Sequence, residues 1–185
     1  AKAARKLRED ELCDAIPVHD TDQDNSNPDA HPAITTIQWS YQNMERLPPG
    51  LHKHRERLTA LDVSQNRIAK LPSSVALFEC LVELDVSHNR LERVPPALGR
   101  CKKLEVLVLN NNRLRKLGTW VVELPKLRRL HLYGNPMVDP PAEVSDLGVE
   151  PIREYLQALK VVNAWDPDDV TEFTRHAQET QGLEL

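Results

Sequence analysis

The chain repeats one pattern of apolar residues at a nearly fixed spacing of 23 residues. The three complete units open with L-x-x-L-x-[VL]-x-x-N-x-[IL], and the units before and after them keep most of these columns. A period of about 20 to 50 residues is typical of solenoids, in which similar units stack side by side. The sequence therefore predicts five stacked units over residues 34–141, with atypical units at both ends. They start at Ile34, Leu58, Leu81, Leu104 and Leu127.

Each column of the repeat has a role that follows from its chemistry. The second and third apolar positions alternate as one face of a short β-strand does, and a single unit cannot bury that face alone. An asparagine follows each strand, and its amide offers both a donor and an acceptor for backbone groups at the turn. The first unit has Gln42 in this column, and the others have Asn66, Asn89, Asn112 and Asn135.

These motifs resemble leucine-rich repeats of the intracellular kind, whose second half reads L-P-x-x-[LV]. That half appears as Leu47-Pro48, Leu71-Pro72 and Val94-Pro95, each followed by an apolar residue. The resemblance implies an α/β fold, namely a solenoid with a curved parallel sheet and a convex side of short helical or irregular segments, with flanking helices. It also implies that the asparagine column forms a ladder along the solenoid.

Departures from the repeat predict local irregularities. The first unit has 24 residues, and since Leu51 keeps its register, the extra residue is expected after it on the convex side. Gly118 stands where neighbouring units have proline, so the convex segment after it is expected to differ. Trp120 in that segment is expected to be either exposed or packed beneath the C-terminal cap. The prolines that follow Asn135 end the solenoid, because they lack an N–H donor.

Residues 1–33 are predicted to form an N-terminal helical arm and linker. The first 16 residues have the pattern of a short amphipathic helix, whereas the acidic remainder has too little apolar content to fold alone. Such a tethered helix either caps the exposed edge of the first repeat or docks on a partner.

Two further segments follow the repeat domain at residues 34–141. Residues 142–165 are predicted to hold a C-terminal capping helix, with Pro151 in its first turn and apolar residues along one face. Residues 166–185 are predicted to form an acidic tail with a short helix, because acidic residues cluster where a helix would begin.

Composition narrows the classes of function and the compartment. The net charge of −4 and the aromatic content of 4% argue against a general nucleic-acid binder. No apolar run approaches the roughly 18 residues of a membrane span, so no membrane insertion is expected. Cys13, Cys80 and Cys101 form an odd set without a C-x-x-C pair, which favours a reducing, intracellular compartment. The cytoplasm is the first expectation, with a mitochondrial or cytoskeletal assembly as the alternatives.

The candidate binding surface is the concave face of the expected sheet. Its middle is acidic, whereas Arg128 and Arg129 mark its C-terminal end, so it suits a partner with a basic or mixed element. The predicted contact residues, here called the concave surface, are Gln38, Tyr41, Asp62, Ser64, Glu83, Asp85, His88, Asn110, His131 and Tyr133.

A catalytic or metal-binding role has little support in the sequence. Asp62 and Asp85 are expected about 5 Å apart on consecutive strands, close enough to share a proton or an ion. No closed ligand set accompanies them, and no P-loop, H-E-x-x-H motif or nucleophile elbow occurs. The sequence favours a solvated carboxylate pair, no metal or other cofactor, and no enzymatic activity.

A second candidate surface is basic. Two columns of positive residues are expected beside the strand exits, where they would grip RNA phosphates or an acidic protein surface. Glu45 and Glu92 lie between them and weaken the field. These basic columns consist of Arg46, Arg67, Lys70, Arg90, Arg93, Arg113 and Lys116.

The sequence thus favours a non-catalytic protein–protein interaction and scaffolding module. It is expected to hold one or more proteins through its concave surface and its flanking arms, as a subunit of a larger intracellular assembly. One alternative is a ribonucleoprotein component that contacts RNA through the basic columns. The other, from family analogy alone, is a regulatory subunit of a phosphatase or small GTPase pathway.

Overall fold

The computed structural model describes residues 35–164, with side chains for residues 36–160. The predicted N-terminal arm and linker (residues 1–33) and the acidic tail with its helix (166–185) lie outside the described residues. Those predictions, and the boundaries of the four segments, remain untested.

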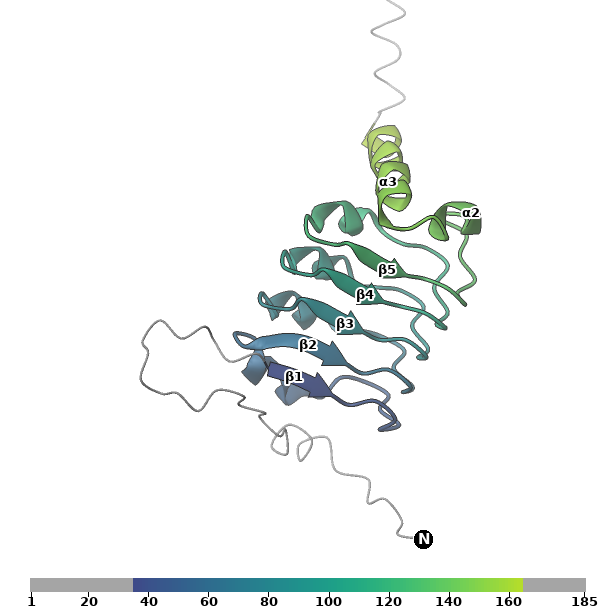
Figure 1. Ribbon diagram of the computed structural model, residues 1–185. Coiled ribbons are helices and arrows are strands. Elements are labelled where there is room, and N and C mark those ends of the chain that lie inside the picture. Colours follow the sequence, from purple (N-terminus) through teal and green to yellow (C-terminus); the bar gives the residue numbers. More distant parts are fainter. Residues whose placement is uncertain (1–34, 165–185) are drawn as a thin grey trace, which may run out of the picture.

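The sheet consists of five short parallel strands in sequence order (Figure 1). The register pairs Leu61 with Leu84, Leu84 with Leu107, and Leu107 with Leu130, so this leucine column lies side by side on neighbouring strands. The predicted open α/β solenoid is confirmed. The strands are β1 (Thr35–Gln38), β2 (Leu58–Asp62), β3 (Glu83–Asp85), β4 (Val106–Val108) and β5 (Arg129–His131).

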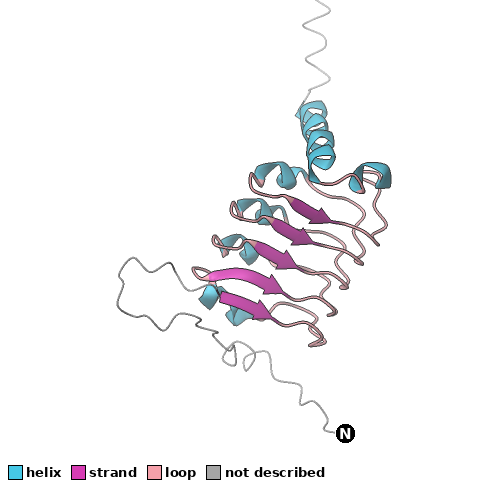
Figure 2. Ribbon diagram, in the orientation of Figure 1, coloured by secondary structure: helices cyan, strands magenta, loops and turns pink. Residues whose placement is uncertain are grey.

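Short 3-10 helices form the other side of the solenoid (Figure 2). Each lies in the second half of the repeat and starts directly after its proline, or after Gly118 in the fourth unit. The helix of the first unit has six residues whereas the others have five, so the extra residue expected after Leu51 is accommodated there. The four helices are η1 (Pro49–His54), η2 (Ser73–Leu77), η3 (Pro96–Arg100) and η4 (Thr119–Glu123).

The prediction that the segment after Gly118 differs from its neighbours is wrong. Gly118 has φ −76° and ψ 163°, close to the φ −71° and ψ 152° of Pro72 before η2, so glycine here adopts the extended conformation that proline provides elsewhere. A Cβ on Gly118 would lie 2.7 Å from Cδ1 of Trp120, so the indole occupies the space that a side chain would need. Trp120 is 3% exposed, and its helix η4 packs against the C-terminal helix. Of the two alternatives for Trp120, packing beneath the C-terminal cap is therefore the one observed.

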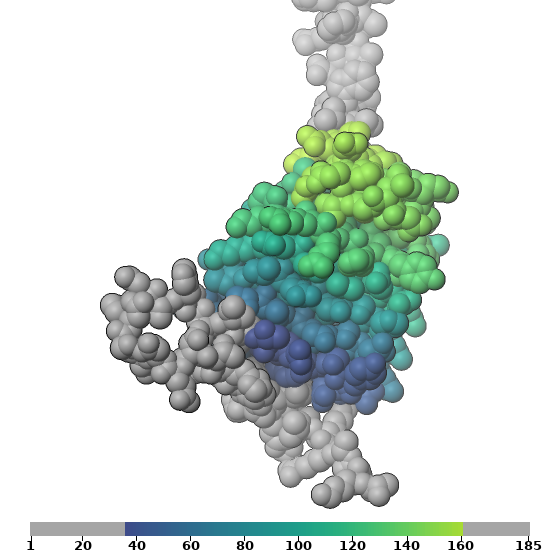
Figure 3. Space-filling view, in the orientation of Figure 1, coloured from purple at the N-terminus to yellow at the C-terminus, as the bar shows by residue number. Residues whose placement is uncertain are grey.

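The core is one continuous apolar cluster between the sheet and the 3-10 helices. Burial of a large apolar side chain contributes roughly 1.5 to 3 kcal/mol, and here the gain arises between adjacent units. The units form contiguous layers from one end of the solenoid to the other (Figure 3). In the second unit, which starts at Leu58, the buried apolar residues are Leu58, Leu61, Val63, Ile68, Leu71, Val75 and Phe78.

The expected asparagine ladder joins each unit to the one before it. Asn89 is buried and donates from Nδ2 to the carbonyl oxygens of Val63 at 2.9 Å, in the preceding unit, and of Val86 at 3.1 Å in its own. Its Oδ1 accepts from the N–H of Ile68 at 2.9 Å, again in the preceding unit. Asn112 and Asn135 repeat the arrangement, so one side chain closes its own turn and fastens the neighbouring one.

The first unit lacks the ladder asparagine and uses a different arrangement. Gln42 donates from Nε2 only to the carbonyl of Ser40, two residues away. Asn66 compensates from the next unit, because its Oδ1 accepts from the backbone N–H groups of both Gln42 and Met44, each at 3.0 Å.

Two helices close the C-terminal end. The helix predicted around Pro151 is present as α3 (Val149–Ala164), and a second, four-residue helix that the periodicity did not reveal, α2 (Ala142–Ser145), precedes it. Along the described part of the chain, every helix is too short or too polar to cross a bilayer. The cap continues the core with Val149, Ile152 and Leu156, all buried.

Side chains of α3 also bind the last turn. Arg153 donates from Nη2 to the carbonyl oxygens of Leu124 at 2.6 Å and Leu127 at 3.3 Å, at the end where no further unit follows. Its Nη1 bonds the Glu150 carboxylate at 2.9 Å. Burial, and then a hydrogen bond to Asp139 and the charge of that carboxylate, raise the pKa of Tyr155. Arg153 thus fastens the cap to the solenoid.

Replacing the amide of Asn89 tests the ladder. Asn89→Ala leaves the buried N–H of Ile68 and several carbonyl groups without their partner, and each unsatisfied buried group costs roughly 1 to 3 kcal/mol. We expect the free energy of unfolding in urea to fall by about 2 to 4 kcal/mol. Asn110→Ala is the matched control, because the Asn110 side chain makes no hydrogen bond within residues 35–164. Equal losses in the two variants would contradict the role of the ladder.

Replacing the guanidinium of Arg153 tests the cap. Arg153→Met keeps most of the aliphatic stem but removes the donors to Leu124 and Leu127, and hydrogen bonds to charged groups contribute roughly 1.5 to 3 kcal/mol. We expect a loss of that size in urea unfolding, with faster amide hydrogen exchange in α3. Arg100→Met, at an exposed position on η3, should change neither measurement. Unaltered exchange in α3 of the Arg153 variant would contradict this anchoring.

Candidate functional site

The structure places the predicted concave surface on the solvent face of the sheet, opposite the 3-10 helices. Strand side chains alternate between faces, so the buried leucine column fixes the neighbouring positions on the outer side. The residues are either exposed (Gln38, Tyr41, Glu83, His88, His131 and Tyr133) or half-buried (Asp62, Ser64, Asp85 and Asn110).

The two aspartates of this face lie directly opposite each other on β2 and β3. Oδ1 of Asp62 accepts from the N–H of Ser64, and Oδ1 of Asp85 accepts from the N–H of Ser87, both at 2.8 Å. Each carboxylate therefore stabilises the exit of its own strand as well as adding negative charge to the surface. Among residues 35–164, no group of three or more His, Cys, Asp or Glu side chains is arranged to hold a metal ion.

The turn after each strand places a residue of every unit in the left-handed region, and the first unit has a second one, Asn43. His88 and Asn111 have φ near +50°, a conformation that costs a non-glycine residue roughly 1 to 2 kcal/mol. Their side chains meet, with Nδ2 of Asn111 3.1 Å from Nε2 of His88. In the last unit a Cβ on Gly134 would clash with Oδ1 of Asn111, so a side chain there would displace that amide. This column is Tyr41, Gln65, His88, Asn111 and Gly134.

A cleft of about 330 Å³ lies at the C-terminal end of this face, between β5 and the connection from α2 to α3. It brings together predicted contact residues and cap residues that sequence reasoning missed. The positive φ of Gly148, +101°, marks the turn of the cap, but the sequence gives no indication that this turn faces β5. The lining residues are Asn110, Arg128, Arg129, Leu130, His131, Leu132, Tyr133, Ser145, Asp146, Gly148 and Val149.

The basic columns lie on the rim where the strands exit. Backbone hydrogen bonds from the N–H of Arg90 to Ile68 at 2.9 Å and from the N–H of Arg113 to Leu91 at 2.8 Å keep successive turns in step. The side chains of both columns are exposed. Arg46 differs from the rest, because it also lines an apolar groove of about 380 Å³ between η1 and η2 on the convex side.

Cys101, the buried one of the two described cysteines, is not a reactive thiol. Cys80 and Cys101 are both free thiols. Burial, opposed by the charge of Lys102, raises the pKa of Cys101 from 9.0 to about 11, and its Sγ donates to the carbonyl of Val75 at 3.3 Å. A thiol that stays protonated at neutral pH is a poor nucleophile.

Comparison with known proteins agrees with this architecture. A family model described as leucine-rich repeat matches residues 79–137. A leucine-rich repeat protein of Leptospira interrogans matches with 32% identity and a TM-score of 0.51, over 60% of this chain and 26% of that chain. The BIR3–SERK2 complex of Arabidopsis thaliana matches with 31% identity and a TM-score of 0.50, over 60% of this chain and 61% of that chain.

Other comparisons add less. The BIR2 ectodomain of Arabidopsis thaliana, at 23% identity and a TM-score of 0.52 over 71% of this chain and 81% of that chain, supports the fold alone. Curated protein sequences give no match. The chain spans about a quarter of the Leptospira protein and less than two thirds of the plant chain of the complex.

The repeat columns, the parallel sheet and the family match lead to one assignment. Leucine-rich repeat domains generally mediate protein–protein interactions and are typically not enzymes. Residues 79–137 match the leucine-rich repeat family, and residues 35–164 have the solenoid fold of leucine-rich repeat proteins.

Proposed function

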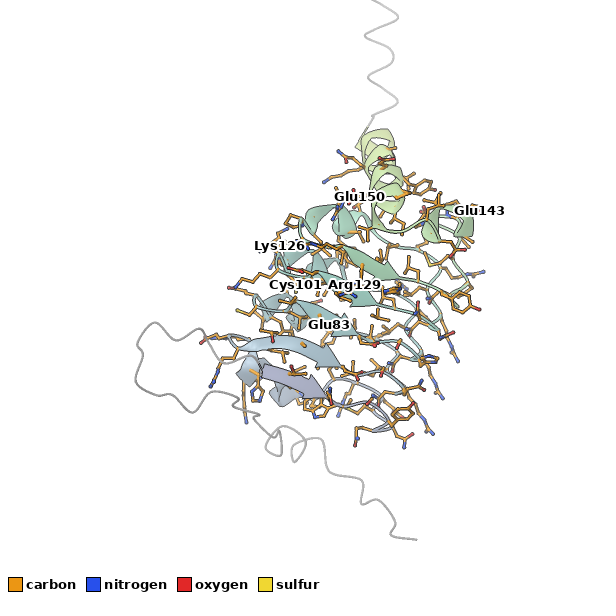
Figure 4. All side chains as sticks on the ribbon, viewed as in Figure 1. Glu83, Cys101, Lys126, Arg129, Glu143 and Glu150 are labelled. Atoms are coloured by element: carbon orange, nitrogen blue, oxygen red, sulfur yellow. The ribbon has the colours of Figure 1, made fainter. Side chains whose placement is uncertain are left out.

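We propose that the chain is a non-catalytic scaffolding module that holds a protein partner on its concave surface, within a larger intracellular assembly. The observation that carries the proposal is the separation of opposite charges along the sheet. Glu83 lies opposite Val106 and Val106 lies opposite Arg129, so the acid and the base are two strand spacings, about 10 Å, apart (Figure 4). Neither forms an ion pair with another described residue.

Such a surface favours a partner whose basic and acidic groups are arranged to face the acidic and basic groups of the sheet. Carboxylates of β2 and β3 would face basic side chains of the partner, and Arg128 and Arg129, at the start of β5, would face acidic ones. Complementary potentials across an interface give specificity and speed association.

Two exposed tyrosines mark the ends of this face. Tyr41, 73% exposed, follows β1, and Tyr133, 76% exposed, follows β5. Tyrosine is enriched in protein interfaces, because it offers a large rigid contact area with a polar end. The two residues are the candidate anchors of the partner.

The intracellular part of the proposal rests on the free thiols of Cys80 and Cys101. Disulfides are common in secreted proteins and rare in the cytosol. The plant match named above as an ectodomain supports only the fold, so it does not bear on the compartment of this chain.

RNA binding through the basic columns is the alternative. The observation that favours it is the alignment of exposed arginines on successive turns, held in step by backbone hydrogen bonds. Glu92, also exposed on this rim, reduces the net positive charge.

Neutralising the acidic centre tests the proposal. The variant Asp62→Asn/Glu83→Gln/Asp85→Asn removes three charges but keeps the side-chain oxygens that cap the strand exits. If each exposed charge contributes about 0.5 kcal/mol, partner affinity should fall about tenfold. Quantitative affinity purification from native extract, with folding checked by circular dichroism, measures the loss.

The control reverses the charge of the other surface. Arg67→Glu/Arg90→Glu/Arg113→Glu should retain the protein partners. If the neutralised variant recovers an unchanged set of proteins, the concave surface is not the binding site. If RNA is recovered with the wild type and lost in the arginine variant and at about 200 mM salt, the RNA alternative is correct instead.

A further inference from the structure

Among the described residues, no strand lies beside the outer edge of β5. In the preceding unit, the N–H of Leu109 donates to His131 and the N–H of Asn111 donates to Tyr133, both at 2.8 Å. Leu132 and Gly134 hold the same two positions in the last unit. Within residues 35–164, neither of their N–H groups has an acceptor.

The same edge also offers an acceptor. The carbonyl of Val82 accepts from the N–H of Glu105 at 2.8 Å, and the carbonyl of Glu105 accepts from the N–H of Arg128 at 2.9 Å. The carbonyl of Arg128 is next in this series, and no described residue follows to bond it. Two donors and one acceptor therefore remain at the spacing of a β-ladder.

The C-terminal cap covers the apolar core but does not pair with this edge. The cleft described above separates β5 from Asp146, Gly148 and Val149 of the cap. The hydroxyl of Ser145 donates to the carbonyl of Pro140 at 3.2 Å, so that side chain is bonded within the cap. Figure 1 shows α2 and α3 beyond β5, with no strand between them.

Side chains along the edge specify the chemistry of a sixth strand. Arg129 and His131 lie on the outer face of β5, and Leu130 lies between them on the core side. In the register that relates β4 to β5, a strand beside β5 would place alternate residues next to these two groups. Arg128 and Arg129 make no ion pair with any described residue.

We propose that this cleft binds an extended segment of a partner protein, in which acidic residues alternate with apolar ones and whose backbone adds a sixth strand to β5. Acidic side chains contact the arginines and His131, and the apolar ones lie over Leu130 and Val149. Main-chain hydrogen bonds supply affinity in such strand addition, and alternate side chains supply specificity. The site extends the proposed protein-binding function to a particular peptide, at the end of the concave surface.

Hydrogen exchange on the full chain provides the first test. The probe is a synthetic nine-residue peptide of alternating glutamate and valine. The amides of Leu132 and Gly134 should exchange rapidly without the peptide and at least tenfold more slowly with it. If both amides are already protected in the chain alone, the edge is occupied by another segment of this chain or by a second copy, and the proposal is wrong.

Fluorescence anisotropy with modified peptides separates strand addition from simple charge attraction. Methylation of alternate backbone nitrogens preserves charge and side chains but removes the ladder, so binding should weaken at least tenfold. Replacing glutamate by lysine should abolish it. Equal affinity for the methylated peptide would overturn the proposal.

Matched protein variants locate the site. Arg128→Glu/Arg129→Glu should weaken peptide binding at least tenfold, whereas Lys103→Glu/Lys126→Glu, the same charge change at exposed positions of other turns, should leave it unchanged. Equal losses in both would overturn the proposal. The Asp62/Glu83/Asp85 neutral variant should still bind the peptide, so a failure of the concave surface and a failure of the edge are distinguishable.

Discussion

A buried asparagine that bonds two successive turns is the interaction on which the rest of this structure depends. In Asn89, one amide satisfies carbonyl groups on both sides of the turn and the N–H of Ile68 in the preceding unit. An apolar side chain would leave these buried groups unpaired, and a shorter polar one would not span both turns. Because each unit depends on its neighbour in this way, the surfaces are fixed as columns rather than as isolated residues.

The column geometry explains why charge on this chain is organised by strand. Asp62 and Asp85 lie opposite each other because the leucines beside them are in register. The same register keeps Glu83 two strands from Arg129, so opposite charges of one column do not neutralise each other. A solenoid therefore preserves, as a surface pattern, the order in which charged residues occur along the chain.

The repeat could be predicted from the sequence because its physics is local and periodic. Column spacing was enough to predict the strands and the extra residue after Leu51, and the resemblance to leucine-rich repeats implied the asparagine ladder. The conformation around Gly118 could not be predicted, because it depends on where the Trp120 ring packs in three dimensions. The cleft at β5 was missed for a similar reason: it arises where the α2–α3 connection approaches the sheet, and neither segment alone indicates that contact. Whether the concave residues bind a partner remains a prediction.

The two sides of the last unit end differently, and this difference bears on function. On the convex side, Arg153 of the cap donates to the carbonyls of Leu124 and Leu127, so the last turn is bonded to the cap. On the sheet side, the N–H groups of Leu132 and Gly134 receive no such partner from the cap. A cap that paired with both sides of the last unit would also supply acceptors for these two N–H groups. A charged, three-residue edge strand resists indiscriminate pairing, because little length is available and Arg129 disfavours a second copy of itself. An edge that is open yet protected in this way selects for a ligand with the opposite charge.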